Sequence, residues 1–238
     1  MMDIRRIIEH GAEKLEVKIS PGAAAAFSEY LSILEVSNES INLTAIKGSE
    51  NIIRLHFLDS LALMKAVEFS NAKVIDVGSG AGFPGLPLKF AEPSIDLTLL
   101  DATRKKTAFL SDLCTSLRTD VEIVNARAED AAHIDKMRER FDIAVSRAVA
   151  HLDILCELCL PFVRVGGAFF AMKSADFEGE LDGASGAMRI LGAELAQVIK
   201  YEIAETGVFR NIICINKIAS TPTEYPRRFS KIKNQPLI

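Results

Sequence analysis

The stretch from Val74 to Gly85, which reads VIDVGSGAGFPG, constrains the fold of this chain more than any other segment. Its first four residues form a short run of mostly β-branched residues, which predicts a buried strand ending near Val77. Glycines then alternate with other residues at Gly78, Gly80 and Gly82. They permit a tight turn and close approach of a ligand to the backbone. Pro84 suits the first turn of a helix, where its missing N–H costs nothing. The segment therefore predicts the strand, glycine loop and helix of a nucleotide-binding α/β fold.

Asp76, two residues before the first glycine, indicates which nucleotide this loop binds. A dinucleotide site has the spacing G-x-G-x-x-G and holds a pyrophosphate over the helix N-terminus, whereas this loop reads G-x-G-x-G-x-x-G. A carboxylate at Asp76 would repel a pyrophosphate but could support an ammonium or a sulfonium, directly or through the loop amides. S-adenosylmethionine carries both cations, so the segment favours it as the cofactor.

A second acid, Asp101, ends the next predicted strand and lies 23 residues after Gly78. This spacing is close to that of the acid that binds ribose hydroxyls in dinucleotide-binding folds. S-adenosylmethionine and NAD both carry a ribose diol, so Asp101 does not distinguish them. The alternative is that Asp101 only caps the helix predicted to start near Thr103, and we favour ribose binding.

Strands and helices alternate after Asp76, which predicts an α/β fold with a doubly wound, mainly parallel sheet of seven strands. The last two strands are separated only by residues 205–210 and predict an antiparallel C-terminal hairpin. The candidate strands are Val74–Val77, Leu97–Asp101, Val121–Asn125, Phe141–Ser146, Gly167–Met172, Ala196–Ile203 and Asn211–Lys217.

We expect three parts along the chain: an N-terminal helical extension packed on the core (residues 1–70), a core (71–217) and a basic C-terminal tail (218–238). Within the extension, Pro21 and Gly22 separate the first helix from the second. A third amphipathic segment runs from about Glu50 to Phe69.

The length of 238 residues is ordinary for one α/β domain with a full core. No apolar run reaches the roughly 18 residues of a membrane span, and the N-terminus lacks the apolar core of a signal peptide. Four cysteines without a secretion signal fit a reducing cytoplasm, so we expect a cytoplasmic protein with no membrane partner.

Cys156 and Cys159 are spaced like half a zinc site or a redox pair, but no second close pair of cysteines exists. The segment from His151 to Leu160 indicates a buried helix, in which cysteine packs as a small hydrophobic residue. We therefore favour a structural role for both cysteines and expect no metal.

The net charge of −4 is unevenly distributed. The tail carries four bases (Arg227, Arg228, Lys231 and Lys233) against one acid, Glu224. It is therefore +3, which leaves −7 for the rest of the chain. Tyr225 and Phe229 lie among these bases, and such a mixture contacts phosphates and stacks on bases in RNA-binding segments. A tail that docks on the sheet through its aromatic residues is an equal alternative.

Several motifs together resemble the bacterial small-subunit ribosomal RNA guanine-N7 methyltransferase G family, also called glucose-inhibited division protein B. The resemblance runs nearly end to end. The motifs are Asn42–Ile46 with His56–Leu61, the loop Asp76–Gly85, Ala126–Glu129, Ser146–Ala150 and Tyr225–Arg228. This chain departs from the family in two places: it has no tryptophan, and Phe229–Ser230 stand where members often carry a glycine.

The resemblance implies a Rossmann-like class I methyltransferase that uses S-adenosylmethionine to methylate N7 of a guanine in 16S rRNA, guanine 527 of the 530 loop. Gly78 and Phe83 would contact the cofactor, and Asp101 would hold its ribose. Ala128 and Glu129 would border the adenine. Arg147, just past the fourth strand, would lie near the methyl donor and the target, which makes it the candidate catalytic residue. The partner would be 16S rRNA or the small ribosomal subunit, with the enzyme as a monomer.

The chemistry fits a site without a catalytic base. Guanine N7 has an in-plane lone pair and no proton, so alignment and desolvation supply most of the rate enhancement. The sequence shows no Asp/Asn-Pro-Pro-aromatic motif of N6-adenine enzymes. Two other interpretations remain: an NAD-dependent oxidoreductase on a Rossmann fold, and a non-catalytic RNA-binding module.

Four further residues have competing interpretations. His56 and Asp59, at positions i and i+3, could bind a metal or RNA, but a pair that packs the N-terminal helices on the core is favoured. Lys173 follows the fifth strand, where RNA contact and a solvated loop lysine are equally good predictions. Lys106 is expected to be a solvated helix residue.

Overall fold

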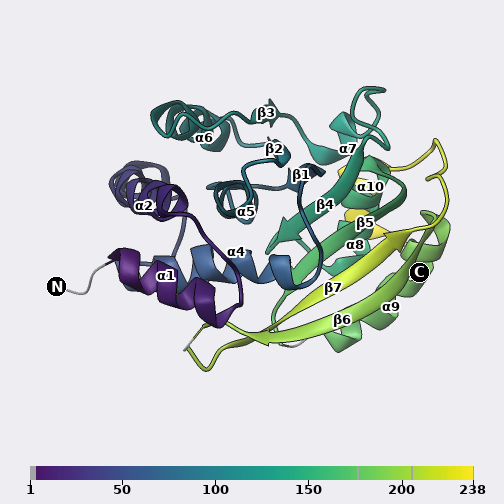
Figure 1. Ribbon diagram of the computed structural model, residues 1–238. Coiled ribbons are helices and arrows are strands. Elements are labelled where there is room, and N and C mark those ends of the chain that lie inside the picture. The colour runs from purple at the N-terminus through teal and green to yellow at the C-terminus, as the bar shows by residue number, and fades with distance from the viewer. Residues whose placement is uncertain (1–3, 176, 205, 238) are drawn as a thin grey trace.

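The computed structural model describes residues 4–175, 177–204 and 206–237, which form a seven-stranded sheet with helices on both faces (Figure 1). The strand order is β3-β2-β1-β4-β5-β7-β6. Strands β1 to β5 run parallel, and β7 runs antiparallel to both β5 and β6. The strands are β1 (Lys73–Val77), β2 (Asp96–Asp101), β3 (Glu122–Asn125), β4 (Phe141–Arg147), β5 (Val163–Lys173), β6 (Ala193–Glu202) and β7 (Phe209–Lys217).

This topology confirms the predicted doubly wound, mainly parallel sheet and its antiparallel C-terminal hairpin. β5 and β6 begin three or four residues earlier than predicted, whereas the other strands begin within two residues of the predicted position. β5 starts at Val163 because an irregularity in its pairing with β4 lets the strand continue through Gly166, whose φ is +82°. β6 starts at Ala193, and its first residues are largely exposed at the sheet edge, so no apolar alternation marks them.

Successive residues of the central strands point into two apolar clusters, one on each face of the sheet. Val74 and Ile143 lie in the first cluster, and Ile75 and Ala144 lie in the second. The first face is covered by α1 (Ile4–Lys14), α2 (Pro21–Ile41), α5 (Gly85–Ala91), α6 (Arg104–Ser116) and the helical segment 49–65. The second face is covered by α7 (Ala128–Ala131), α8 (Leu152–Cys159), α9 (Glu178–Ile190) and α10 (Phe229–Asn234).

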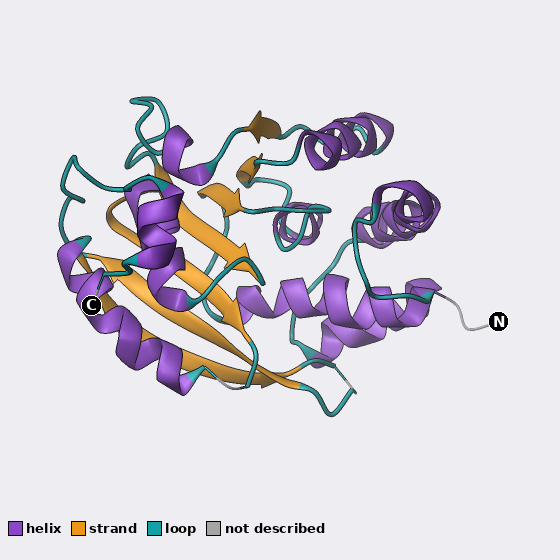
Figure 2. Cartoon of the chain, turned by 180° about the vertical axis from the view of Figure 1, so that it is seen from behind, coloured by secondary structure: helices purple, strands orange, loops and turns teal. Residues whose placement is uncertain are grey.

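Figure 2, seen from behind, shows helices of the second set crossing in front of the strands. Cys156 and Cys159 are free thiols that are fully buried on α8 within the second cluster. Within the described residues, no helix is both long and apolar enough to cross a membrane.

The N-terminal extension shares the first cluster with the sheet. Ser20 caps α2 by accepting a hydrogen bond from the Ala23 N–H at 3.1 Å, and Pro21 occupies the first helical position, so the predicted break is confirmed. The segment 49–65 is helical in four pieces: α3 (Ser49–Ile52), the π-helix η1 (Ile53–Leu58), α4 (Asp59–Leu61) and the 3₁₀-helix η2 (Ala62–Lys65). It ends at Lys65 and not at Phe69 as predicted. π-Helical turns are rare and frequently mark functional sites, and this one carries His56.

The prediction for Pro84 is wrong. α5 begins at Gly85, and Pro84 precedes it, joined to Phe83 by a cis peptide bond. The glycine loop therefore reaches one residue further than expected before the helix starts.

Candidate active site

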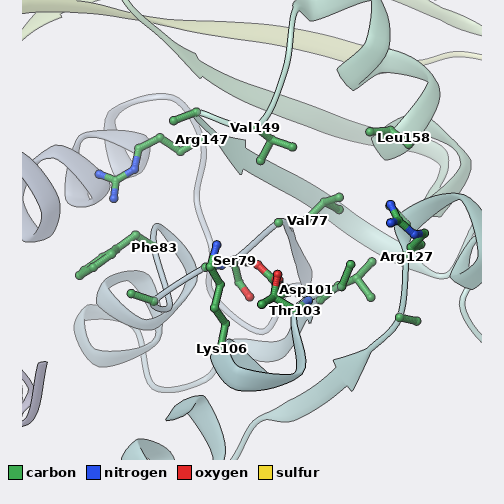
Figure 3. Close-up of a pocket in the computed structure, with 18 of the residues that line it drawn as sticks. Val77, Ser79, Phe83, Asp101, Thr103, Lys106, Arg127, Arg147, Val149 and Leu158 are labelled. Carbon is green, nitrogen blue, oxygen red and sulfur yellow. Dashed lines mark hydrogen bonds between the residues drawn. The ribbon is translucent and has the colours of Figure 1, made fainter. Parts of the chain in front are cut away.

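A cavity of about 510 Å³ opens at the carboxyl ends of β1, β2, β3 and β4, over the glycine loop (Figure 3). In doubly wound sheets this edge is where ligands bind, and the volume suits a small organic molecule. Segments far apart in the sequence form its wall: the glycine loop, the ends of β2 and β4, α7, His56 of η1 and Phe229 of α10.

The three alternating glycines have different surroundings. Their φ angles are +77°, +59° and +106° for Gly78, Gly80 and Gly82, a region that side chains disfavour. Gly78 and Gly80 line the cavity. A Cβ on Gly82 would instead meet the Leu86 side chain at 2.6 Å and the Tyr30 hydroxyl at 2.7 Å. The prediction that Gly82 binds the cofactor is therefore corrected: its missing side chain makes room for the core beneath the loop.

Asp76 lies beneath the loop and is not part of the cavity wall. Its carboxylate is fully buried, and Oδ2 accepts a hydrogen bond from the Gly85 N–H at 2.8 Å. Oδ1 has no hydrogen-bond partner among the described residues, and burial raises the pKa of Asp76 to about 7. Of the two roles predicted for Asp76, direct contact with the cofactor is corrected, and support through the loop backbone fits the geometry.

Asp101 stands on the cavity wall and holds two backbone segments. Oδ2 accepts from the Gly80 N–H at 2.9 Å, and Oδ1 accepts from the Thr103 N–H at 2.8 Å. Thr103 is the N-cap residue of α6, so Asp101 braces the entry to that helix. Each carboxylate oxygen has a second lone pair, so these bonds leave capacity for ligand hydroxyls.

Figure 3 shows that the cavity has two ends: Arg147 and Phe83 lie at one, and Leu158 and Arg127 at the other. The second end is also lined by Ala128 and Glu129 at the start of α7. The Glu129 residue is only 8% exposed, so a ligand here would meet a largely desolvated wall.

Arg147, at the end of β4, is fixed by neighbours from the N-terminal extension. Its guanidinium donates to Asp59 Oδ2 and to His56 Nδ1, both at 2.8 Å. It also lies over the Phe83 ring, 5.1 Å from the centroid. The Arg147 side chain is 8% exposed, so water does not compete for these contacts. The guanidinium is therefore a rigid part of the wall.

His56 connects the N-terminal motif of Thr44 to Arg147. Its ring stacks on Phe83 with centroids 4.5 Å apart and planes 9° from parallel. Burial, then the Arg147 and Arg210 charges, lower the pKa of His56 to about 3. Arg147 can only donate, so Nδ1 accepts, and the neutral ring carries its proton on Nε2, which donates to Thr44 Oγ1 at 2.7 Å.

The pair His56 and Asp59 was predicted to pack the N-terminal helices on the core. Asp59 does so: it is fully buried and accepts from Arg147, from the Tyr201 hydroxyl at 2.8 Å, and lies 3.5 Å from Arg210 Nε. His56 goes beyond that prediction because it also lines the cavity. A helical His one turn before an Asp does not by itself reveal that the His lines a cavity.

Lys173 has an internal role. Its ammonium donates to the Ala150 carbonyl and pairs with Glu180, both at 2.6 Å, and its side chain is 9% exposed. Neither predicted role of Lys173 fits, since it is not a solvated lysine and its ammonium is engaged within the protein, where it fastens the loop after β4 to α9.

The tail docks through its aromatic residues, which is one of the two predicted alternatives. Arg227 is bound to the buried Glu157 of α8 by a pair of contacts at 2.7 and 2.9 Å, so its predicted role as an RNA contact is corrected to that of an anchor. Phe229 and Tyr225 pack against the second cluster. Arg228, Lys231 and Lys233 are exposed. The tail is therefore docked, and it presents three bases to solvent.

Several wall residues were missed or misjudged from the sequence. Lys106, expected to be solvated, lines the cavity, as do Leu43, Val149 and Phe229. Each lies on a segment whose approach to the glycine loop depends on tertiary packing. The sequence did offer a signal for Leu43 and Val149, because both lie within family motifs, Asn42–Ile46 and Ser146–Ala150.

The strand order, the antiparallel β7 and the cavity over a glycine loop together define the class I methyltransferase fold. Solved structures share it. A methyltransferase from Pyrococcus furiosus superposes with a TM-score of 0.55 at 14% identity, covering 81% of this chain and 98% of that one. TYW2 from M. jannaschii, solved in complex with AdoMet, gives 0.53 at 13% identity, covering 67% and 77%. Identities this low show the fold alone.

The sequence comparisons are more specific. The model of a family described as rRNA small subunit methyltransferase G matches residues 23–208. The ribosomal RNA small subunit methyltransferase G of Alkaliphilus oremlandii is 40% identical over 238 residues, covering 99% of this chain and 100% of that protein. The chain therefore belongs to the rRNA small subunit methyltransferase G family. It is an enzyme that transfers one-carbon groups, so the family to which the first of the three interpretations assigns the chain is confirmed.

Proposed function

We propose that the protein transfers a methyl group from S-adenosylmethionine to N7 of a guanine in 16S rRNA, guanine 527 by family resemblance. The cavity carries this proposal. Its end at Leu158 and α7 suits a nucleoside, and its end at Phe83 and Arg147 suits a planar base brought to the methyl group. The name of the Alkaliphilus oremlandii relative supports the substrate class.

Features of the wall fit S-adenosylmethionine. Ser79 Oγ is buried with no hydrogen-bond partner among the described residues, so a polar ligand group would satisfy it. A Cβ on Gly80 would meet no atom closer than 3.9 Å, so the backbone there faces open space. Asp101 would hold the ribose, and Ala128 and Glu129 would border the adenine. The cofactor supplies an electrophilic methyl group on a sulfonium. The AdoMet complex of TYW2 on this fold supports the assignment.

The residues at the other end suit a reaction without a base. Guanine N7 offers a lone pair and has no proton to lose. His56 is neutral at physiological pH, and both its ring nitrogens are engaged, by Arg147 and by Thr44. It is therefore a poor proton acceptor. Alignment of the base and exclusion of water supply the rate enhancement.

Arg147 is the residue we assign to orienting the guanine. Guanine presents O6 and N7 as neighbouring acceptors, so a guanidinium that donates to O6 orients the base and leaves N7 free. Asp59 and the Phe83 ring hold this guanidinium in place before the substrate arrives. Preorganisation of this kind avoids rearrangement during the reaction.

The RNA surface includes the three exposed bases of the tail. Arg228, Lys231 and Lys233 lie on or beside α10 in a chain that is otherwise acidic. Contacts of these three basic side chains with phosphates would attract the RNA locally, although the net charge of the protein is negative. Arg227 and Lys173 are left out because they bind Glu157 and Glu180.

Ligand-induced stabilisation tests the cofactor. S-adenosylhomocysteine should raise the melting temperature of the protein, whereas NAD should not, because the glycine spacing of this loop departs from that of a dinucleotide site. Stabilisation by NAD alone would contradict the assignment.

Methyl transfer tests the tail. We expect the triple variant Arg228→Ala, Lys231→Ala, Lys233→Ala to keep cofactor affinity and to lose RNA methylation sharply. The log–log salt slope of RNA binding should flatten by about 0.7–0.9 for each lost phosphate contact. Equal slopes for variant and wild type would show that the tail does not touch phosphate.

A further inference from the structure

Phe229 belongs to the C-terminal tail, yet it lines the same cavity as the glycine loop. It is half-buried and is the first residue of α10, a short helix whose Ile232 is fully buried. α10 packs against α8, and Figure 1 shows the two helices close together. Leu158 of α8 lines the end of the cavity opposite Arg147. The tail therefore closes the nucleoside end and lies away from the end proposed for the target base.

The position of Phe229 is set by a buried anchor two residues earlier. The Glu157 carboxylate, only 1% exposed, accepts from the Arg227 backbone N–H at 2.7 Å as well as from its guanidinium. Glu157 and Leu158 are neighbours on α8. The same turn of helix thus fixes the tail backbone and forms the cavity wall.

A second anchor holds the start of the tail to the segment after α7. The Arg138 guanidinium donates to the carbonyls of Tyr225 at 2.7 Å, Thr221 at 2.9 Å and Pro222 at 3.0 Å. His133 Nε2 lies 2.9 Å from the Pro226 carbonyl. The tail is therefore held by α8 and by the segment that follows α7, and α7 and α8 both line the nucleoside end.

We propose that the tail is part of the cofactor site, with Phe229 as the aromatic wall against which the adenine ring packs. Arg227, Glu157 and Arg138 are the positioning residues for that wall. This inference rests on the proposed cofactor, and it assigns to the tail a role separate from RNA contact. Base–aromatic contact tolerates small changes of geometry because every base offers a flat π-face.

One consequence concerns α10 itself. It turns Phe229 toward the cavity and carries Lys231 and Lys233 exposed to solvent. Binding of the adenine would stabilise the docked helix, and the docked helix presents Lys231 and Lys233 to the RNA. Cofactor and RNA affinities are then coupled, each raising the other by the same factor.

A single-tryptophan reporter tests the contact directly, because the chain contains no tryptophan. In the variant Phe229→Trp, titration with S-adenosylhomocysteine should change the emission and saturate at one ligand per chain. The matched control is Asn234→Trp, at the exposed end of the same helix, whose emission should stay constant. A silent Trp at position 229, in a protein that calorimetry shows to bind the ligand, would overturn the inference.

Calorimetry on single-residue variants then measures how much Phe229 contributes to ligand affinity. Phe229→Ala should weaken S-adenosylhomocysteine binding by about tenfold, and Asn234→Ala should not change it. Glu157→Gln, which removes the charge that holds Arg227, should weaken binding in the same direction. If wild type fails to bind the ligand, the proposed cofactor is wrong. If wild type binds and Phe229→Ala binds equally well, the proposed cofactor stands and the role of the tail is wrong.

Discussion

The carboxylate of Asp59 offers the sharpest test of how the N-terminal extension serves the cavity. It is fully buried and accepts hydrogen bonds from Arg147 and from the Tyr201 hydroxyl, both at 2.8 Å. It also forms an ion pair with Arg210 at 3.5 Å. The substitution Asp59→Ala removes the charge shared by these three groups. The Arg147 side chain is 8% exposed, so water cannot replace the carboxylate there.

The expected magnitude follows from this burial. Removing one member of a buried ion pair costs about 3–5 kcal/mol, because the other charge stays buried without a partner. Arg210 is 26% exposed and can recover part of its hydration, so we assign the loss mainly to Arg147. Tyr201→Phe removes one hydrogen bond to a charged group and should cost less, about 1.5–3 kcal/mol. A domain of this kind is stable by about 5–15 kcal/mol, so Asp59→Ala should fold with reduced stability.

Urea unfolding followed by circular dichroism measures these losses without a tryptophan signal. The double variant Asp59→Ala, Arg147→Met should lose less than the sum of the single variants, because the unpaired cation is gone. Turnover of Asp59→Ala should fall more than its cofactor affinity, since Asp59 contacts Arg147 and not the nucleoside end. A loss below about 1 kcal/mol, or strict additivity in the double variant, would refute this reasoning.

Three further predictions concern the cofactor loop. Gly78→Val should abolish S-adenosylhomocysteine binding in a folded protein, because a Cβ would meet Val149 Cγ2 at 2.5 Å and the φ is +77°; unchanged affinity by calorimetry would contradict the assignment. Asp101→Ala should weaken cofactor binding by about 1.5–3 kcal/mol with a smaller effect on turnover at saturating cofactor, and equal affinities would leave Asp101 only its backbone contacts. Burial raises the pKa of Asp76 to about 7, so ionisation of Asp76 costs the folded state stability as pH rises from about 4 to 7. Asp76→Asn keeps an acceptor for the Gly85 N–H, so its stability relative to wild type should increase as pH rises from about 4 to 7 and then stay level. Thermal melts of both proteins at pH 5 and pH 8 check this. A difference in melting temperature that is the same at both pH values would count against it.

Local signals in the sequence predicted the sheet well. Short apolar runs that end in Asp76–Val77 and Asp101 predict strands independently of the rest of the chain, and both strands occur. Strand β6 was harder, because its first residues are exposed at the sheet edge and lack alternation. The prediction for Pro84 failed because Pro84 is the N-cap residue of α5 and not a residue of its first turn.

Site residues were predictable where the chemistry lies in one segment. Gly78, Gly80 and Asp101 stand on the cavity wall as the motif spacing indicates. Gly82 does not, because the space beside it is filled by Tyr30 from α2, and no local pattern reveals that contact.

The basic residues were the weakest predictions, since charge in a sequence does not show its partner. In the sequence, Lys173 and Arg227 cannot be told from exposed basic residues. Only tertiary packing pairs them with Glu180 and Glu157. The position of Phe229 on the cavity wall depends on the same packing, because the contact between Arg227 and Glu157 holds the tail there.

Mapping the methylated nucleotide in cells with and without this protein tests the central claim most directly. N7-methylation weakens the glycosidic and ring bonds of guanine, so reduction followed by mild base or amine treatment cleaves the RNA at that site. We predict one cleavage in 16S rRNA, at guanine 527, that is present with the protein, absent without it, and restored by wild type but not by Gly78→Val. Identical cleavage patterns in both cells, or loss of a methyl group from a different ring atom, would contradict the account.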